Sequence, residues 1–165
     1  AFEDAARKLR ESGLADVVVG EAEAGKPILG ICLGMQMLFE KSYEFGEHKG
    51  LGLLKGEIIP MQGNIDPKYK IPHIGWNALN FTKNSELFKY IQEGECVYFV
   101  HSYYLKAKDE SIVKAKSEYG NIIHASVEKD NIFACQFHPE KSGKIGLSIL
   151  KSFALFSFII RCEIF

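Results

Sequence analysis

The chain has 165 residues, of which 47% are apolar, 25% charged and 12% aromatic. A chain of this length can bury a full hydrophobic core, and its composition excludes a disordered or fibrous protein. Twenty Lys and Arg residues against 21 Asp and Glu residues leave a net charge of −1, so the bulk charge points neither to nucleic acid nor to an anionic membrane. We expect a single globular domain over residues 1–165.

Cysteine spacing and the chain ends indicate a cytoplasmic protein. The four cysteines, which form no CxxC pair and have no histidines at zinc-site spacing, are Cys32, Cys96, Cys135 and Cys162. Residues 1–20 lack the basic and apolar regions of a signal peptide. The apolar stretch at residues 153–160 is too short to cross about 30 Å of hydrocarbon. We therefore expect reduced thiols, no metal site and no membrane span.

The first third of the chain carries alternating helix and strand signals. Apolar residues at helical spacing predict a short helix that starts at Phe2 and a second helix over residues 15–24. An apolar run typical of a buried strand follows at residues 28–32, and a helix is predicted over residues 33–42. This order favours an α/β fold, in which helices cover both faces of an open, mixed and largely parallel sheet.

The second half of the chain is dominated by strand signals. The candidates are residues 53–61, 71–81, 97–107, 112–117, 122–127 and 132–137. Turns at residues 119–121 and 129–131 would join the last three candidates as hairpins. The chain then returns to a helix, whose buried stripe would consist of Ile145, Ile149 and Phe153.

A candidate nucleophile lies at the end of the first predicted strand. Residues 30–36 read GICLGMQ and place Cys32 where the strand ends and a helix begins. Gly30 and Gly34 permit a tight turn that would lift the cysteine side chain toward a substrate. A helix N-terminus would also favour the thiolate over the thiol. The alternative for any single cysteine is a buried residue that serves as a small apolar side chain.

A histidine and a carboxylate follow the last predicted strand. His138 is held extended by Pro139 and could act as a general base toward a thiol. Glu140 could accept the second ring N–H and so orient the histidine. Because the carboxyl ends of parallel strands share one edge of a sheet, Cys32 and His138 could meet there. A surface turn would explain the His-Pro-Glu motif alone equally well, so the argument depends on the two motifs together.

These motifs resemble the two catalytic motifs of the class I, triad-type glutamine amidotransferases. Residues 49–53 (KGLGL), 72–77 (PHIGWN) and 98–103 (YFVHSY) narrow the resemblance to the glutaminase subunits of imidazole glycerol phosphate synthase. The resemblance extends over residues 1–153 and implies a flavodoxin-like core.

The resemblance implies that the chain hydrolyses the side-chain amide of L-glutamine without a cofactor and passes ammonia to a cyclase subunit in a heterodimer. Cys32 would attack the amide, His138 would carry the proton, and Glu140 would orient His138. The family pattern implies further roles: glutamine contacts for Gln36, Glu44, Ser102 and Tyr103, an oxyanion contact for the Leu33 N–H, and positions at or near the cyclase-docking face for His73, Trp76 and His101.

Two features depart from the family pattern. Family members begin with a strand and a glycine-rich loop that precede the segment matching Ala1, and this loop supplies part of the oxyanion hole. Lacking that donor, the chain as given is expected to be a poor enzyme by itself. Residues 154–165 are expected to form an atypical, apolar tail.

Two alternatives remain open on the sequence. The chain could be another class I amidotransferase, of the anthranilate or aminodeoxychorismate synthase type, although residues 72–77 argue against this. It could also be a docking module with impaired catalysis, because the oxyanion site would be incomplete. A glutaminase assay in the presence of the cyclase would distinguish these possibilities.

Overall fold

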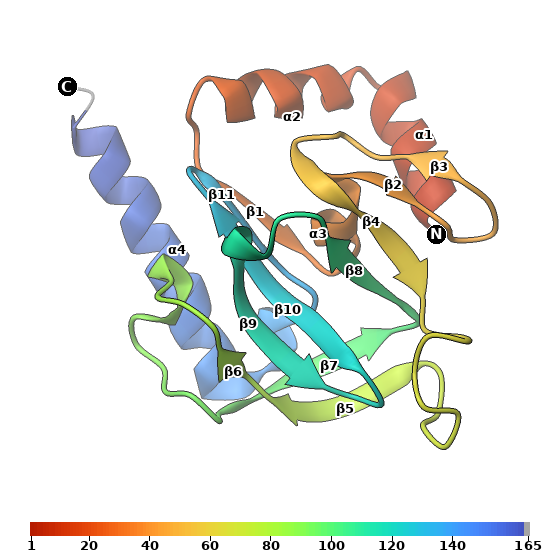
Figure 1. Ribbon diagram of the computed structural model, residues 1–165. Helices are drawn as coiled ribbons and strands as arrows, with labels where there is room; N and C mark the ends of the chain where they lie inside the picture. The colour runs from red at the N-terminus through yellow and green to blue at the C-terminus, as the bar shows by residue number, and fades with distance from the viewer. Residues whose placement is uncertain (164–165) are drawn as a thin grey trace.

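The computed structural model describes the backbone of residues 1–163 and the side chains of residues 1–159. The helices are α1 (Phe2–Glu11), α2 (Leu14–Glu23), α3 (Leu33–Met37) and α4 (Gly143–Glu163). The strands are β1 (Ile28–Ile31), β2 (Phe39–Ser42), β3 (His48–Lys49), β4 (Leu54–Pro60), β5 (His73–Ala78), β6 (Asn80–Phe81), β7 (Cys96–His101), β8 (Tyr103–Ala107), β9 (Val113–Glu118), β10 (Ile122–Lys129) and β11 (Ile132–Cys135). Short 3₁₀ turns occur at η1 (Glu86–Phe88), η2 (Glu110–Ile112) and η3 (Pro139–Lys141). Figure 1 shows this arrangement.

The described strands form three sheets. A five-stranded sheet has the order β1-β11-β10-β9-β6, a four-stranded sheet has the order β3-β2-β4-β8, and β5 pairs with β7. The mixed α/β fold is thus confirmed, but the sheets are less parallel than predicted. Only β1 with β11 and β2 with β4 pair in parallel among these strands. The short turns on either side of β10 allow only antiparallel pairing with its neighbours, which is why the two predicted hairpins form.

Three predicted elements change where tertiary contacts override the local pattern. The helix predicted over residues 33–42 ends at Met37, and the chain continues as β2, where Phe39 is fully buried in the core between the four- and five-stranded sheets. The predicted strand at residues 97–107 is two strands, β7 and β8, which belong to different sheets. The predicted strand at residues 71–81 likewise divides into β5 and β6. The elements predicted before residue 32 form as expected.

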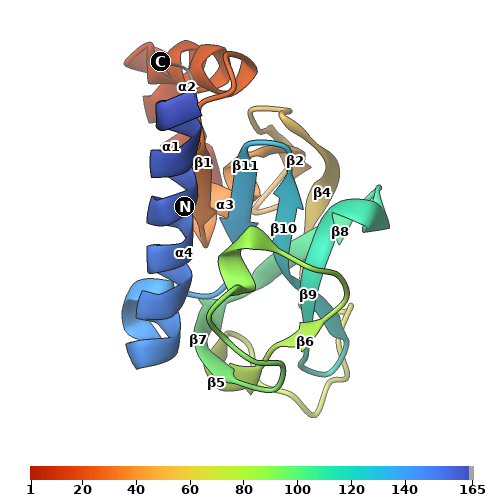
Figure 2. The ribbon, with the colours of Figure 1, turned by 90° about the vertical axis from the view of Figure 1, so that its left-hand side faces the viewer.

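Strand β11 lies at the centre of the core, and all four of its residues are buried. Ile132 and Ala134 face α3 and the four-stranded sheet. Phe133 and Cys135 face the opposite side, where they pack with α4. Helices therefore lie on both faces of the five-stranded sheet, as predicted. On one of these faces the four-stranded sheet packs beside α3 (Figure 2).

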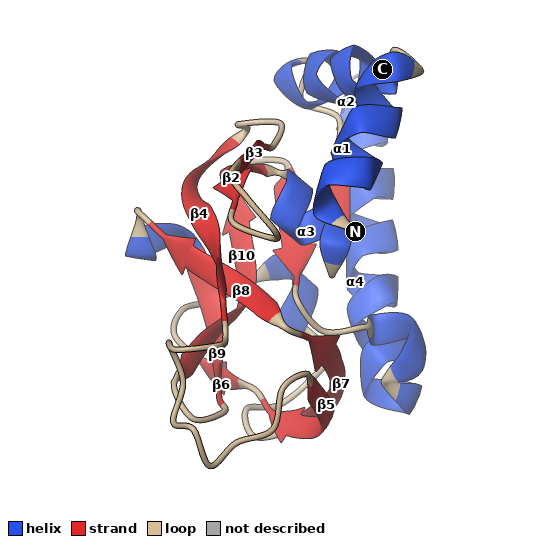
Figure 3. Cartoon of the chain, turned by 90° about the vertical axis from the view of Figure 1, so that its right-hand side faces the viewer, coloured by secondary structure: helices blue, strands red, loops and turns tan. Residues whose placement is uncertain are grey.

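Helix α4 runs along one side of the molecule, away from the four-stranded sheet (Figure 3). Ile149 is fully buried, and Ile145 and Phe153 pack beside it, which confirms the predicted stripe. The predicted tail at residues 154–165 continues α4 through Glu163, and its last two residues lie outside the described part of the chain. No helix in the described part is long and apolar enough to cross a bilayer.

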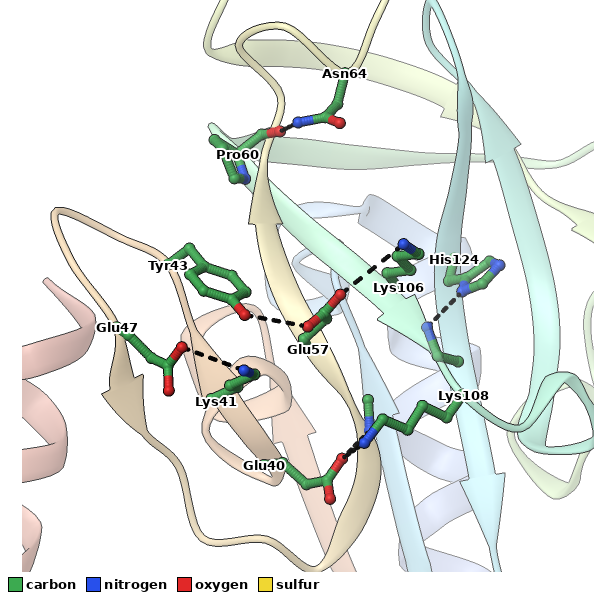
Figure 4. A network of polar contacts seen from close by, with 12 residues as sticks. Glu40, Lys41, Tyr43, Glu47, Glu57, Pro60, Asn64, Lys106, Lys108 and His124 are labelled. Atoms are coloured by element: carbon green, nitrogen blue, oxygen red, sulfur yellow. Dashed lines mark hydrogen bonds and ion pairs between the residues drawn. The ribbon is translucent and has the colours of Figure 1, made fainter.

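The outer face of the four-stranded sheet is polar (Figure 4). Lys108 Nζ lies 2.8 Å from Glu40 Oε2, which also accepts the Gly56 N–H at 3.0 Å. These two donors lower the pKa of Glu40 to about 2. On the same face the Tyr43 hydroxyl donates to Glu57 at 3.4 Å. Exposed pairs of this kind contribute little stability, so their main effect is to keep this face in water and the opposite face in the core.

Helix α4 approaches η3 at a glycine. A Cβ atom on Gly146 would lie 1.8 Å from the Pro139 carbonyl oxygen, far inside van der Waals contact. The Gly146 N–H also donates to the Ser142 carbonyl at 3.1 Å. Because Gly146 has no side chain, η3 can pack directly against the backbone of α4.

We predict that Gly146→Ala lowers the free energy of unfolding by about 1–3 kcal/mol, because the backbone of η3 must move to admit a methyl group. Gly20→Ala is the matched control: Gly20 is also helical, and a Cβ there meets nothing within 4 Å. This control should raise stability by up to about 1 kcal/mol through helix propensity. Urea denaturation of both variants measures the difference, and equal effects would contradict the close approach.

Candidate active site

Cys32 lies on a strained turn between β1 and α3. Its backbone has φ 50° and ψ −107°, a region that residues with a side chain rarely adopt. Its N–H donates to the Cys135 carbonyl at 2.8 Å, which extends the β1 and β11 pairing by one residue. A Cβ on Gly30 would lie 2.9 Å from the Gly34 backbone. The tight turn predicted from these glycines is present.

The thiol of Cys32 is less acidic than predicted. Burial raises its pKa, and the charge of Glu140 raises it further. Hydrogen bonds from the Leu33 N–H and the Gln136 amide lower the pKa, as does the charge of Lys141, but burial has the larger effect. Helix α3 has only five residues, so its dipole is small. The N–H at the start of α3 therefore favours the thiolate as expected, but burial outweighs it and leaves the pKa of Cys32 raised.

The predicted pairing of His138 with Glu140 is present. His138 Nδ1 lies 2.6 Å from Glu140 Oε1, so Nδ1–H donates to the carboxylate and Nε2 is left as the basic nitrogen. The His138 N–H donates to the Tyr98 carbonyl at 2.9 Å. The Ser142 hydroxyl accepts the Tyr98 N–H at 2.9 Å and donates to the His138 carbonyl at 2.6 Å. Ser142, for which the sequence indicated no role, thus anchors the turn to β7.

Strand β7 brings the two motifs together. The Val100 carbonyl lies 3.9 Å from Cys32 Sγ, while the Tyr98 carbonyl binds His138. These carbonyls are two residues apart on an extended strand, which corresponds to roughly 7 Å. Among the described residues, Cys32 Sγ and His138 share no direct hydrogen bond. The structure therefore places the thiol and the histidine side by side without joining them.

A cleft of about 320 Å³ opens at the thiol. It is lined by Ala1, Cys32, Leu33, Gln36, Glu44, Phe45, Val100, His101, Ser102 and Tyr103. The predicted glutamine contacts and the predicted oxyanion donor thus meet in one cleft with Cys32, whereas His138 and Glu140 are not among its lining residues. Phe45 and Val100 were missed, because an exposed aromatic residue in a turn and a strand valine carry no functional signal in sequence.

Two residues predicted to contact glutamine, Gln36 and Glu44, form hydrogen bonds within the protein. Gln36 Nε2 donates to the Tyr103 carbonyl at 3.1 Å and to Gln136 Oε1 at 3.0 Å. Glu44 accepts the Phe2 N–H at 2.6 Å. Gln136, buried and 3.6 Å from Cys32 Sγ through Nε2, is a further site residue that sequence reasoning missed.

The predicted docking residues separate into two groups. His73 and His101 are buried, so the expectation that they contact a partner is corrected. Side chains alternate along β5, which turns His73 inward and leaves Ile74 and Trp76 exposed by 58% and 56%. Their cross-strand partners on β7 are Val100 and Tyr98. This apolar face of β5 therefore borders the strand that holds both catalytic motifs.

Within the described part of the chain, no group of three or more His, Cys, Asp and Glu side chains gathers as a metal ion would require. The described cysteines, Cys32, Cys96 and Cys135, are free thiols. The side chain of Cys162 lies outside the described residues.

Residues 11–155 match the family model described as glutamine amidotransferase class-I. The chain therefore belongs to the class I glutamine amidotransferases. Solved structures agree on the fold: a glutamine amidotransferase has a TM-score of 0.67 at 18% identity, covering 93% of this chain and 75% of that one. The PurLQS structure from Thermotoga maritima has a TM-score of 0.65 at 24% identity, covering 87% and 68%.

Curated relatives narrow the family. The HisH subunit of imidazole glycerol phosphate synthase from Aquifex aeolicus is 54% identical over 93% of this chain and 72% of its own length. The HisH subunits from Wolinella succinogenes (52%) and Caldanaerobacter subterraneus (51%) also cover 93% of this chain, and 75% and 73% of their own lengths. Within its class, the chain is a member of the HisH subunit family.

We predict opposite effects of two neighbouring charges on the thiol. Glu140→Gln removes a negative charge that raises the pKa of Cys32, so iodoacetamide should alkylate Cys32 faster at pH 7.5, by about two- to fivefold. Lys141→Met removes a positive charge and should slow the reaction by a similar factor. Mass spectrometry of the Cys32 peptide measures both rates. Changes in the same direction would show that structure, not charge, controls the thiol.

Proposed function

We propose that the chain is the glutaminase subunit of an imidazole glycerol phosphate synthase. It hydrolyses L-glutamine to glutamate and ammonia. The ammonia passes to a cyclase subunit that forms imidazole glycerol phosphate and aminoimidazole carboxamide ribotide in histidine biosynthesis. The observation that carries this proposal is the strained Cys32 turn, which faces a cleft lined by Gln36, Glu44, Ser102 and Tyr103. The identity to HisH subunits supports the substrate and the pathway.

The site suits a two-step displacement. The sulfur of Cys32 forms a bond to the carboxamide carbon, and the carbon–nitrogen bond breaks as the thiol proton passes through His138 Nε2 to the departing ammonia. Water then attacks the thioester, gives its proton to His138 and releases glutamate and the thiol. Glu140 holds the His138 tautomer through Nδ1. The Leu33 N–H stabilises the oxyanion of both tetrahedral intermediates.

The raised pKa of Cys32 gives the proton transfer particular importance. Because burial disfavours a free thiolate, the thiol must lose its proton as it attacks. The two motifs contact neighbouring carbonyls of β7, and no direct hydrogen bond joins Cys32 Sγ to His138 in this structure. This separation is the observation that favours the second candidate, a docking module with impaired catalysis. Ammonia release measured with the cyclase present distinguishes the two.

The other class I enzymes fit less well. An anthranilate or aminodeoxychorismate synthase subunit would share the thiol and histidine motifs, but the described relatives at 50% identity and above are HisH subunits. We place the protein in the cytoplasm, where free thiols such as Cys32 and the exposed Cys96 persist. We assign no cofactor, nucleic acid or membrane to the reaction, because hydrolysis of an amide by a thiol needs none of them.

We predict that Cys32→Ala abolishes glutamine hydrolysis and leaves cyclase binding unchanged, because the thiol alone forms the covalent bond. Cys96→Ala is the control, since Cys96 is exposed and lies outside the cleft, and it should keep full activity. An electrophilic glutamine analogue should label Cys32 in the folded chain. Labelling of Cys96 or Cys135 in its place would overturn the assignment.

The apolar face of β5 is the proposed docking surface for the cyclase. Ile74 and Trp76 project from β5, and the Trp76 ring meets the Tyr98 ring edge-on at 5.9 Å. Exposed aromatic residues of this kind often dominate binding energy at protein interfaces. The face also lies on the sheet that carries Val100 beside the thiol, so a partner bound there would be close to the released ammonia.

We predict that Trp76→Ala weakens cyclase binding by at least about 1 kcal/mol, which is fivefold or more in Kd. Tyr90→Ala is a matched control, because Tyr90 is an aromatic residue of nearly equal exposure, 54% against 56%, on another part of the surface. Calorimetry measures both affinities, and thermal unfolding confirms that both variants fold. Unchanged binding by the folded Trp76 variant would exclude this face.

A further inference from the structure

Two buried histidines face each other beneath the docking surface. His73 Nδ1 lies 3.0 Å from His101 Nε2. The His73 ring is stacked between Tyr119, with ring centroids 3.8 Å apart, and Phe99, at 4.9 Å. Neither imidazole serves the reaction as derived above, and a hydrogen-bonded pair of rings in a protein core needs an explanation.

The outer nitrogens of both rings have fixed roles. His101 Nδ1 lies 2.8 Å from the Tyr103 carbonyl oxygen, which can only accept, so this nitrogen carries a proton. His73 Nε2 lies 2.8 Å from Asn77 Oδ1. The Asn77 amide is oriented by its own Nδ2, which donates to the Glu118 carbonyl at 3.1 Å. His73 Nε2 therefore also carries a proton.

Counting protons favours a charged pair over a neutral one. A neutral imidazole has a single N–H, and both rings already use theirs on the outer nitrogens. The two inner nitrogens would then face each other as lone pairs at 3.0 Å, which is a repulsive contact. One additional proton between them completes an unbroken chain from Asn77 to Tyr103. The neutral alternative requires the Asn77 amide to turn, which would place its oxygen against the Glu118 carbonyl.

The chain of hydrogen bonds continues to the thiol. The Tyr103 carbonyl accepts from both His101 and Gln36, which fills its two lone pairs. Because Gln36 donates to this carbonyl, its second N–H donates to Gln136 Oε1. That bond turns the Gln136 amide nitrogen toward Cys32 Sγ, 3.6 Å away. Each orientation is set by the one before it.

We propose that the His73–His101 pair holds one shared proton at neutral pH and acts as a positioning pair, which keeps the donor of Gln136 directed at Cys32. The shared proton follows from the hydrogen bonds alone, and only its role in catalysis rests on the proposed function. The pair also joins β5, which carries the docking surface, to the wall of the cleft.

Other groups near the pair act in both directions. Burial opposes the proton and lowers the pKa of both rings, and the charges of His73 and His138 lower that of His101 as well. The hydrogen bonds to Asn77 and the Tyr103 carbonyl raise the same values. Against burial stands the 3.0 Å separation of the inner nitrogens, at which two lone pairs repel each other and a shared proton joins them. As the pH rises through the pKa of the pair, the proton is lost and the inner bond breaks.

The first test is nitrogen NMR of the full chain labelled with ¹⁵N-histidine, recorded between pH 5 and pH 9. Single His→Gln variants assign the five histidines. At pH 7 we expect both outer nitrogens of the pair to be protonated, with one further proton shared by the inner nitrogens. The two rings should lose that proton together at one midpoint. A neutral pair at pH 7, or two separate titrations, would overturn the proposal.

The second test reads the thiol and does not depend on glutaminase activity. His101→Gln interrupts the series of hydrogen bonds, so the Gln136 amide loses its orientation. Alkylation of Cys32 by iodoacetamide at pH 7.5 should then slow about three- to tenfold. His124→Gln is the control, because His124 is a partly buried histidine that takes no part in these hydrogen bonds. Gln136→Met should slow alkylation as much as His101→Gln. An unchanged rate in folded His101→Gln would refute the positioning role, even where the shared proton is found.

Discussion

The structure depends on the parallel pairing of β1 with β11. This pairing extends one residue past β1, through the Cys32 N–H and the Cys135 carbonyl, and so fixes the point at which the chain must turn. The strain at Cys32 is tolerated because the strand before it is hydrogen-bonded and Gly30 has no side chain to meet the Gly34 backbone. Gln136 and His138 directly follow β11 in the sequence. The same strand therefore places Gln136 next to the Cys32 thiol and leads to the His138 turn.

Strand β7 connects that pairing to the rest of the site. One side of it holds the Cys32 thiol and the His138 turn through carbonyl oxygens, and the other pairs with β5, which presents Ile74 and Trp76 to solvent. The exposed apolar face of β5 therefore lies one strand away from both the thiol and the histidine turn.

The electrostatics of the site oppose an active thiol at rest. Burial and the Glu140 carboxylate both raise the pKa of Cys32, while Leu33, Gln136 and Lys141 lower it by less. The same carboxylate orients the base. Glu140 thus acts on both motifs: its charge raises the pKa of the thiol, and its carboxylate accepts the His138 Nδ1–H.

The sequence by itself determined the local features of this protein. Gly30 and Gly34 around Cys32 predicted the turn, where a side chain on Gly30 would meet the Gly34 backbone, and the two-residue step from His138 to Glu140 predicted their hydrogen bond. Tertiary structure decided what depends on distant partners. Burial of Phe39 ended α3 early, packing against Phe99 and Tyr119 buried the His73 ring, and the environment of Cys32 raised its pKa where a lowered one was expected. Each of these outcomes depends on surfaces contributed by remote segments, which local spacing does not encode.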